Sequence, residues 1–372
     1  MCSQLMYYYR MFLSCKDNEE AVETCSVSVT TSLITLTLFS LFRKGNPLAH
    51  IKLRFILHYF SMVLKKMPTG CVSFWRESLQ KEALPNWEHE ENLRSKLWIQ
   101  LPLLGVASNS SIEDSSGCLQ VDFANEYIGG GVLCKGAVQE EIRFLICPEM
   151  IVSCLLCEKM DPLEVIRIVG AQRYSSYFGY GIHHHSEVYG KSDISNNNMY
   201  CSRVKCELVA MDATLFKYSF KNTQYSKENI DRELNKAYIG FMSRYPVASP
   251  VATGNWGCGV FGGDKELKSL IQMIAAARAG RDMIYYTFAN PQFQKSMYNL
   301  HISHSIQEAL EWSRSRSKYS RSFGVEQVSF QSLGLRRSSF LLPTILYFTH
   351  SETYKARFPT HGELLRCYFD RM

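Results

Sequence analysis

The run from Gly117 to Glu149 limits the possible folds of this chain more than any other part of it. It reads GCLQVDFANEYIGGGVLCKGAVQEEIRFLICPE, so a short apolar segment, a triple glycine and paired glutamates follow one another closely. Leu119 to Phe123 has the composition of a buried strand and carries Asp122 near its end. The glycines at 129–131 allow positive φ and let backbone N–H groups approach an anion. The run predicts a strand, a glycine loop and a helix; for the glycines alone, a flexible turn is the alternative.

The paired glutamates open the helix that follows the glycines. Adjacent helical residues diverge by about 100°, so Glu140 and Glu141 are not expected to do the same job. We expect one to face a ligand and the other to turn toward supporting structure. With Asp122 nearby, they suggest acid/base chemistry on a phosphorylated sugar. The alternative is a solvated pair that the helix dipole favours in a first turn.

A second glycine-rich segment, GNWGCGVFGGD at 254–264, follows the apolar stretch PVAT and precedes a helical pattern. A strand, a glycine loop and a helix N-terminus together form a physical arrangement for binding a diphosphate. Two such loops in one domain indicate a ligand with a pyrophosphate and two sugars. The motifs of a P-loop or dinucleotide-dependent enzyme are lacking, which disfavours that class.

Strands and helices alternate around these loops, which predicts an α/β protein with a layered sheet covered by helices on both faces. The strands expected from β-branched and apolar content are at 165–169, 204–211 and 283–288, and the helices are at 229–242 and around 267–275.

The part of the chain before this pattern reads as a separate helical region, residues 1–98. Its residues 51–65 predict an amphipathic helix. The apolar side chains at helical spacing there are Leu53, Ile56, Leu57, Phe60 and Leu64. The apolar run 26–42 follows acidic residues and is rich in Ser and Thr, so we expect a buried helix or strand there rather than a signal peptide or membrane span.

The α/β domain is expected at 99–310 and a divergent tail at 311–372, with a basic Ser/Arg linker at 313–322. The 13 irregularly spaced cysteines argue against a disulfide framework and favour a reducing compartment. The net charge of +6 suits a polyanionic ligand but also keeps a surface soluble. Cys154 and Cys157 are expected to be core thiols, and His183–His185 a solvated loop, so no metal site is predicted.

Several of these segments, taken in order, resemble the sequence signature of poly(ADP-ribose) glycohydrolases. The matching segments are VDFAN (121–125), GGG followed after seven residues by QEEIRFL (139–145), YSSYFGY (174–180), RELNKAY (232–238), ATGNWGCGVFGGD (252–264) and Thr287-Phe288. After GGG the chain has Leu133-Cys134-Lys135, where the family usually has small polar residues.

The resemblance implies a macrodomain-like α/β fold with a mixed sheet, preceded by an α-helical accessory domain. It implies hydrolysis of the ribose–ribose O-glycosidic bonds of poly(ADP-ribose), with release of ADP-ribose. By the family pattern, Glu141 would protonate the leaving oxygen and then deprotonate the attacking water, with Asp122 and Glu140 as the accompanying acidic residues. No cofactor and no metal are implied.

The resemblance also implies which residues would bind the ligand. Ile112 and Glu113 would meet the adenine. Asn125 and Gln139 would help to place the ligand, and Tyr180 would cover it from one side. Phe288 would lie near the distal ribose. The residues that would wrap the diphosphate are Asn255, Trp256, Gly257, Cys258, Gly259 and Val260.

The implied partners are poly(ADP-ribose) and poly(ADP-ribosyl)ated proteins in the nucleus or cytoplasm, in the DNA damage response. The chain is expected to act as a monomer, without a membrane and without direct contact with DNA. An alternative of another class is a polymer-binding module of the same fold that has lost turnover. The joint retention of Asp122, Glu140 and Glu141 favours the enzyme.

Overall fold

The computed structural model describes residues 21–41, 46–87, 103–177, 179–180, 206–216 and 218–303. The chain divides into two compact units, 1–322 and 323–372, and every described residue lies in the first. The predicted tail, its Ser/Arg run and His183–His185 lie outside the described residues.

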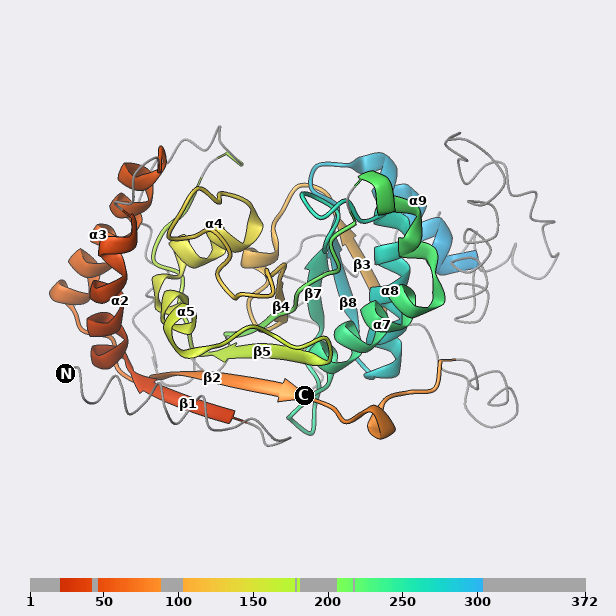
Figure 1. The fold of residues 1–372 in the computed structure, drawn as a ribbon, viewed down its shortest axis with the longest axis horizontal. Helices are drawn as coiled ribbons and strands as arrows, with labels where there is room; N and C mark the ends of the chain where they lie inside the picture. The colour runs from red at the N-terminus through yellow and green to blue at the C-terminus, as the bar shows by residue number, and fades with distance from the viewer. Residues whose placement is uncertain are drawn as a thin grey trace, which may run out of the picture. The chain divides into compact units, whose positions relative to one another are not determined.

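A mixed sheet forms the centre of the first unit. Among the described residues, eight strands take the order β1-β2-β5-β6-β4-β7-β8-β3. Their bounds are β1 Ala21–Ser26, β2 Cys71–Ser78, β3 Leu104–Ala107, β4 Leu119–Asp122, β5 Glu164–Val169, β6 Glu207–Ala210, β7 Val251–Gly254 and β8 Met283–Tyr286. The pairs from β1 to β6 are antiparallel, and those from β6 through β4, β7 and β8 to β3 are parallel. In Figure 1, β1, β2 and β5 run across the view while β3, β7 and β8 run up it, so the sheet is strongly twisted.

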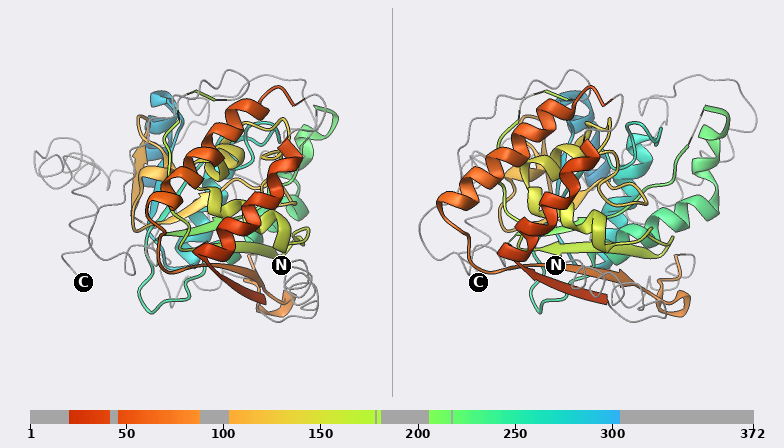
Figure 2. Two further views of the ribbon diagram at one scale, coloured as in Figure 1. Left: turned by 90° about the vertical axis from the view of Figure 1, so that its left-hand side faces the viewer. Right: turned by 60° about the vertical axis from the view of Figure 1, so that its left-hand side comes forward.

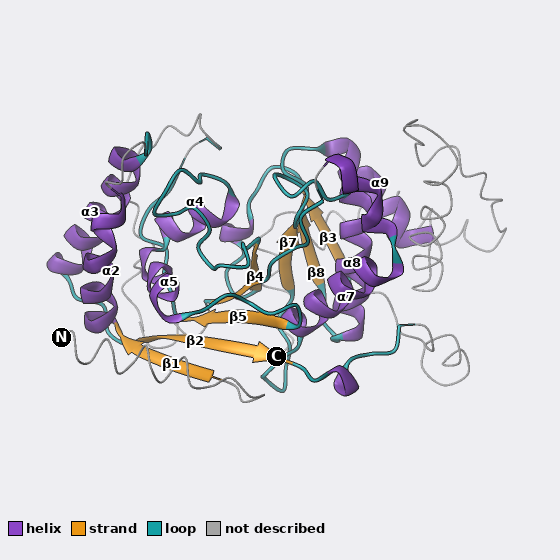
Figure 3. Cartoon of the chain, in the orientation of Figure 1, coloured by secondary structure: helices purple, strands orange, loops and turns teal. Residues whose placement is uncertain are grey.

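Helices cover both faces of this sheet (Figures 1 and 3). They are α2 Val27–Leu41, α3 Ala49–Lys65, α4 Gln139–Ile146, α5 Ser153–Leu156, α7 Lys227–Phe241, α8 Lys265–Arg278 and α9 Pro291–Ser303, with short 3-10 turns η1 Lys81–Ala83, η3 Ile112–Asp114, η4 Pro148–Val152 and η6 Tyr218–Tyr225. Figure 2 shows α2 and α3 side by side, in front of α4 and α5 when viewed from that end. The helices α7 and α8 pack together on the opposite face.

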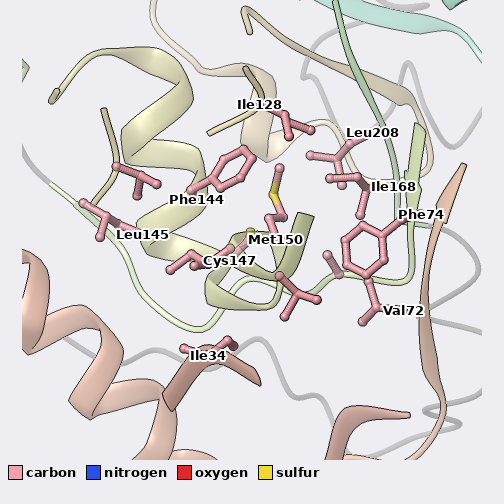
Figure 4. Packing of buried hydrophobic residues seen from close by; sticks show 14 of the residues in the cluster. Ile34, Val72, Phe74, Ile128, Phe144, Leu145, Cys147, Met150, Ile168 and Leu208 are labelled. Atoms are coloured by element: carbon pink, nitrogen blue, oxygen red, sulfur yellow. The ribbon is translucent and has the colours of Figure 1, made fainter. Parts of the chain in front are cut away.

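The alternation of side chains along β5 explains the two layers. Ile166 and Ile168 join the large apolar cluster shared with α3, α4 and η4, part of which Figure 4 shows. Arg167, between them in sequence, points to the other face and donates to the backbone oxygens of Gly240 and Met242 at the end of α7. Successive strand residues face opposite sides, so one buried strand serves both cores.

The predicted α/β pattern is confirmed, with small differences in element ends. The predicted helices at 229–242 and 267–275 are α7 and α8, and the predicted strands are β5, β6 and β8. Residues 27–41 of the apolar run 26–42 form α2. No helix among the described residues is both long and apolar enough to span a membrane. Cys154 and Cys157 are both free thiols.

The amphipathic helix at 51–65 is confirmed as α3, and of its predicted apolar stripe Ile56 is buried and Leu53 and Phe60 pack against the core, whereas two members are not buried. Leu57 and Leu64 are 51% and 85% exposed. The buried side chains are Lys52, Phe55, Ile56, Tyr59 and Val63. The core-facing stripe starts with Lys52, and apolar periodicity does not indicate a charged residue as part of a buried face.

The predicted helical region also contributes to the sheet. β1 pairs with β2, and β2 pairs with β5 from Ser73↔Val169 to Ser78↔Glu164. The side chains of Arg167 and Glu77 join the two strands with two hydrogen bonds of 2.8 and 2.9 Å. Residues before 98 therefore supply the helices α2 and α3 and also the strands β1 and β2 of the sheet.

Candidate active site

The parallel strands bring distant segments to one edge of the sheet. β3, β4, β6, β7 and β8 all run in the same direction, so their carboxyl ends meet. Asp122 ends β4, the second glycine loop follows β7, and Phe288 follows β8. Ligands of open α/β sheets bind beyond this edge. The fold thus brings together most of the site residues expected from the sequence.

Asp122 lies at this edge as a fully buried carboxyl group. Neither of its oxygens has a hydrogen-bond partner among the described residues. Burial raises the pKa of Asp122 to about 8; the Arg143 guanidinium opposes the rise, and the carboxylates of Glu141 and Glu113 add to it. A protonated, unpartnered carboxyl group can donate to or accept from the hydroxyl groups of a ligand.

Glu140 is the glutamate that turns toward supporting structure. Its Oε2 accepts the Asn125 N–H at 3.0 Å and its Oε1 accepts the Gly129 N–H at 2.6 Å. Burial and then the charge of Asp122 raise the pKa of Glu140 well above its usual range, although the two N–H groups favour the carboxylate. Glu140 therefore ties the segment after β4 to the start of α4.

Glu141 binds the glycine loop instead. Its Oε1 accepts the Gly131 N–H at 2.8 Å and its Oε2 accepts the Val138 N–H at 2.9 Å. The second bond is the backward half of a capping box, in which the third residue of a helix satisfies the N-cap N–H. Each oxygen keeps a further lone pair for another donor. The two glutamates thus accept different backbone N–H groups of the same loop.

The first glycine loop is shaped to admit these two carboxylates. Gly130 has φ +48°, and a Cβ placed on it would lie 2.5 Å from Glu140 Oε2 and 2.7 Å from Glu141 Oε1. The N–H groups of Gly129 and Gly131 bind the glutamates, and that of Gly130 donates to the Tyr127 oxygen at 3.1 Å. The loop does form an anion nest, but for the protein's own acids. In this structure the N–H groups of Gly129 and Gly131 are therefore used by side chains of the protein and are not open to a diphosphate.

The two predicted amides bind the backbone around Asp122. Gln139 accepts the Phe123 N–H at 2.8 Å and donates to the Val121 oxygen at 3.2 Å. Asn125 accepts the Tyr127 N–H at 3.0 Å. Both side chains thus fix the path of the chain on either side of Asp122.

The second glycine loop is anchored inward and open outward. Trp256 is fully buried, and its Nε1–H donates to the Met211 oxygen at 2.8 Å. Asn255 accepts the Tyr285 hydroxyl at 3.1 Å. At the tip, a Cβ on Gly259 would meet nothing within 4 Å, and Val260 is 77% exposed. The Cys258 N–H turns inward to the Asn255 oxygen, and Gly257 has φ +72°.

Two aromatic rings face each other beside the glutamates. The Tyr180 and Phe288 centroids are 4.9 Å apart, and the Gln139 N–H donates to the Tyr180 hydroxyl at 3.2 Å. Phe288 has φ +55° and is 64% exposed. A non-glycine residue in the left-handed region carries strain, which is common at ligand-binding sites.

The expected adenine contacts follow β3 in η3. Ile112 is buried, whereas Glu113 is partly exposed. The Glu113 carboxylate is near enough for its charge to help raise the pKa values of Asp122 and Tyr180. The carboxylate therefore lies on the same side of the sheet as the acids, and the Ile112 side chain packs inward.

Two buried cations near the acids were not predicted. Arg143 is 3% exposed, and its charge acts on Asp122. It lies one helical turn after Glu140, a spacing that could have indicated it. Lys52, on α3, reaches the glycine loop. Among the described residues no group of three or more His, Cys, Asp or Glu side chains could hold a metal ion.

Comparison with known proteins decides the family. A family model described as "Poly (ADP-ribose) glycohydrolase (PARG), Macro domain fold" matches residues 86–295. This chain belongs to the poly(ADP-ribose) glycohydrolase family. A second model, for the helical domain of the same family, matches residues 5–76. The predicted fold class, a macrodomain-like mixed sheet preceded by a helical domain, is confirmed.

Named relatives agree with this assignment. Poly(ADP-ribose) glycohydrolase 1 of Caenorhabditis elegans is 45% identical over 253 residues, which cover 65% of this chain and 31% of the relative. Probable poly(ADP-ribose) glycohydrolase 2 of Arabidopsis thaliana is 36% identical over 281 residues, with 64% and 53% covered. The chain thus spans 31% and 53% of the lengths of these two relatives. The crystal structure of the glycohydrolase from Thermomonospora curvata matches at 13% identity and a TM-score of 0.33, covering 77% of this chain and 98% of that one.

Proposed function

We propose that the chain hydrolyses the ribose–ribose O-glycosidic bonds of poly(ADP-ribose) and releases ADP-ribose. The observation that carries this proposal is that Glu140 and Glu141 bind one glycine loop at the carboxyl edge of the sheet, with Asp122 near enough for its charge to act on theirs. Family membership supports it, because the named relatives are poly(ADP-ribose) glycohydrolases.

In this proposal Glu141 is the acid and base. The leaving ribose oxygen needs a proton as the glycosidic bond breaks, and the oxocarbenium-like carbon then takes a water molecule. Glu141 would give the first proton and remove one from the water. Its hydrogen bonds to Gly131 and Val138 fix the carboxyl group in one orientation, as general acid/base catalysis requires.

The other acids have different tasks. Asp122, which has no hydrogen-bond partner among the described residues, would bind ribose hydroxyl groups beside the reacting carbon. Glu140 would act as a support, with its two oxygens holding the N–H groups of Asn125 and Gly129. It would keep Asp122 and Glu141 at a fixed separation.

The remaining contacts follow from the open surfaces of the site. The outward turn at Gly259 and Val260 would meet the diphosphate through backbone N–H groups. The rings of Tyr180 and Phe288 would stack against the ligand. Glu113 would reach the adenine from η3. We further propose a division into a helical region at 1–98, the macrodomain at 99–310 and a tail at 311–372, in which β1 and β2 of the first region extend the sheet of the second.

The test is incubation of the purified chain with poly(ADP-ribose) beside Glu141→Gln, with released ADP-ribose measured by chromatography. We expect release by the parent and a loss of about 10²–10⁴-fold in the variant. The alternative, a module that binds the polymer without turnover, is favoured by the unusual Leu133-Cys134-Lys135 after the glycines. Tight polymer binding without release by either protein would select that alternative.

A further inference from the structure

Lys52 is a buried lysine that joins the helical region to the first glycine loop. It lies on the core-facing stripe of α3 and is 1% exposed. Its Nζ donates to three backbone oxygens, those of Gly131 at 2.9 Å, Val132 at 2.9 Å and Cys134 at 2.8 Å. A lysine is rarely buried unless its charge is compensated. Here the three backbone oxygens compensate the charge of the Lys52 ammonium group.

The loop that Lys52 holds is the one that binds Glu141. The Gly131 oxygen accepts from Lys52 while the Gly131 N–H donates to Glu141 Oε1 at 2.8 Å. The same Gly131 oxygen accepts the Gly136 N–H at 3.1 Å, and a Cβ on Gly136 would lie 2.4 Å from Glu141 Oε1. The turn from 131 to 136 therefore wraps the carboxylate, and a displacement of the turn would displace the groups that orient Glu141.

The chemistry of this contact selects the charged form of the lysine. An ammonium group has three N–H donors, which matches three carbonyl acceptors. A neutral amine has two donors and one lone pair, and the lone pair would face the third carbonyl. Hydrogen bonds from an ionised donor are also roughly twice as strong as those between neutral groups.

We propose that Lys52 is a positioning residue for the proposed reaction: its ammonium group fastens the 131–134 turn so that the Gly131 N–H holds Glu141 in its working orientation. The inference rests on the proposed function and extends it to the helical region. That region contributes one side chain to the geometry of the macrodomain site, although Lys52 does not touch the substrate.

The proposal predicts a loss of activity at alkaline pH. Burial lowers the pKa of Lys52 to about 8, and the charges of Glu141 on α4 and Cys134 in the turn oppose that shift. As the pH rises through this value, the ammonium loses a proton and one carbonyl loses its donor. The turnover number should fall while KM changes little.

Two variants of Lys52 and one control variant test this proposal. Lys52→Met should lower kcat about 10–100-fold with less than about a threefold change in KM, as expected for a small misplacement of an acid/base group. Lys52→Arg should recover most of the activity and should not show the fall near pH 8, because arginine stays charged. If the fall in kcat at alkaline pH were caused by Asp122, it would persist in Lys52→Arg. That result would overturn the assignment of the fall to Lys52.

Lys236→Met is the matched control. Lys236 on α7 is also fully buried, donates to the backbone oxygens of Asp161 and Glu164, and has a pKa lowered to about 8. Its loss should reduce stability without a specific loss of kcat. Equal losses of kcat in Lys52→Met and Lys236→Met would reduce Lys52 to a structural role and refute the proposal.

Hydrogen exchange of the parent chain provides a readout that needs no turnover. Amides of 129–138, corrected for intrinsic exchange rates, should lose protection between pH 7 and pH 9, whereas those of α8 should not. Unchanged protection of 129–138 would refute the proposal even if Lys52→Met failed to fold. If the parent releases no ADP-ribose, the proposed function fails, and this measurement still decides whether Lys52 fastens the turn.

Discussion

The two glycine loops look alike in sequence and differ in what they do with their backbone. In the first, the N–H groups of Gly129, Gly130 and Gly131 are all used within the protein, two of them by catalytic-candidate glutamates. In the second, a buried indole anchors the loop and the tip at Gly259 points outward with free space around it. The first loop positions acids, and the second offers an open surface to a ligand.

This difference shows that glycines serve two distinct purposes in one site. At Gly130 the missing side chain makes room for carboxylate oxygens of the same protein. At Gly259 it leaves space that nothing in the described structure occupies. A glycine-rich segment therefore indicates close approach of the backbone to something, and only the surrounding fold shows whether that is a ligand or the protein itself.

The anchor of the second loop gives the largest expected effect. Trp256→Ala should lower the free energy of unfolding by about 3–5 kcal/mol, because it empties a fully buried aromatic site. Urea denaturation measures this change, and KM for the polymer should rise as the loop loosens. Trp256→Phe keeps the ring but removes the N–H to Met211, so it should cost less. A loss below about 1 kcal/mol in Trp256→Ala would mean that the indole does not anchor the loop.

A matched pair of alanine substitutions compares the loops directly. Gly130→Ala should lower stability by about 1–3 kcal/mol, because the new methyl group meets two carboxylates and the backbone has φ +48°. ADP-ribose release should fall at least tenfold as Glu141 is displaced. Gly259→Ala should change stability by no more than about 0.5 kcal/mol. Similar losses in both variants would remove the distinction between the loops.

The buried acid beside the first loop should make stability depend on pH. Folded Asp122 keeps its proton up to a pH of about 8, whereas an unfolded aspartate releases it near its usual pKa of about 4. The folded state thus binds more protons between these values, and its stability falls as the pH rises through them. Asp122→Asn does not titrate, so its stability relative to the parent should rise by about 3–4 kcal/mol between pH 5 and pH 8. If the difference in free energy of unfolding between variant and parent is the same at pH 5 and pH 8, the burial of an unpartnered carboxyl group is contradicted.

The sequence was sufficient to predict the elements that carry local patterns. The helices α7 and α8 have regular apolar stripes, and β5 has a β-branched run. That Glu140 and Glu141 would take different partners was expected from helix geometry alone. Their partners could not be predicted, because the Asn125, Gly129 and Gly131 N–H groups reach them only through the path of the loop.

The residues of α3 whose burial differs from the predicted pattern have a similar explanation. Apolar periodicity counts Lys52 as a solvent residue and Leu64 as a core residue, and the structure reverses both. The acceptors that make Lys52 a core residue come from a turn about eighty residues later. A contact of that range leaves no mark in the local pattern, so the role of Lys52 could not be predicted from the sequence of α3.

The edge strand β3 has a consequence for how the chain is made. β3 pairs in parallel with β8, with Ala107 opposite Tyr286, although about 180 residues separate them. At a synthesis rate of about 5–20 residues per second, β3 leaves the ribosome roughly ten to forty seconds before its partner exists. During translation this edge of the active-site sheet is therefore an unpaired strand. The nascent protein has to keep that strand from pairing elsewhere until the last strand of the sheet arrives.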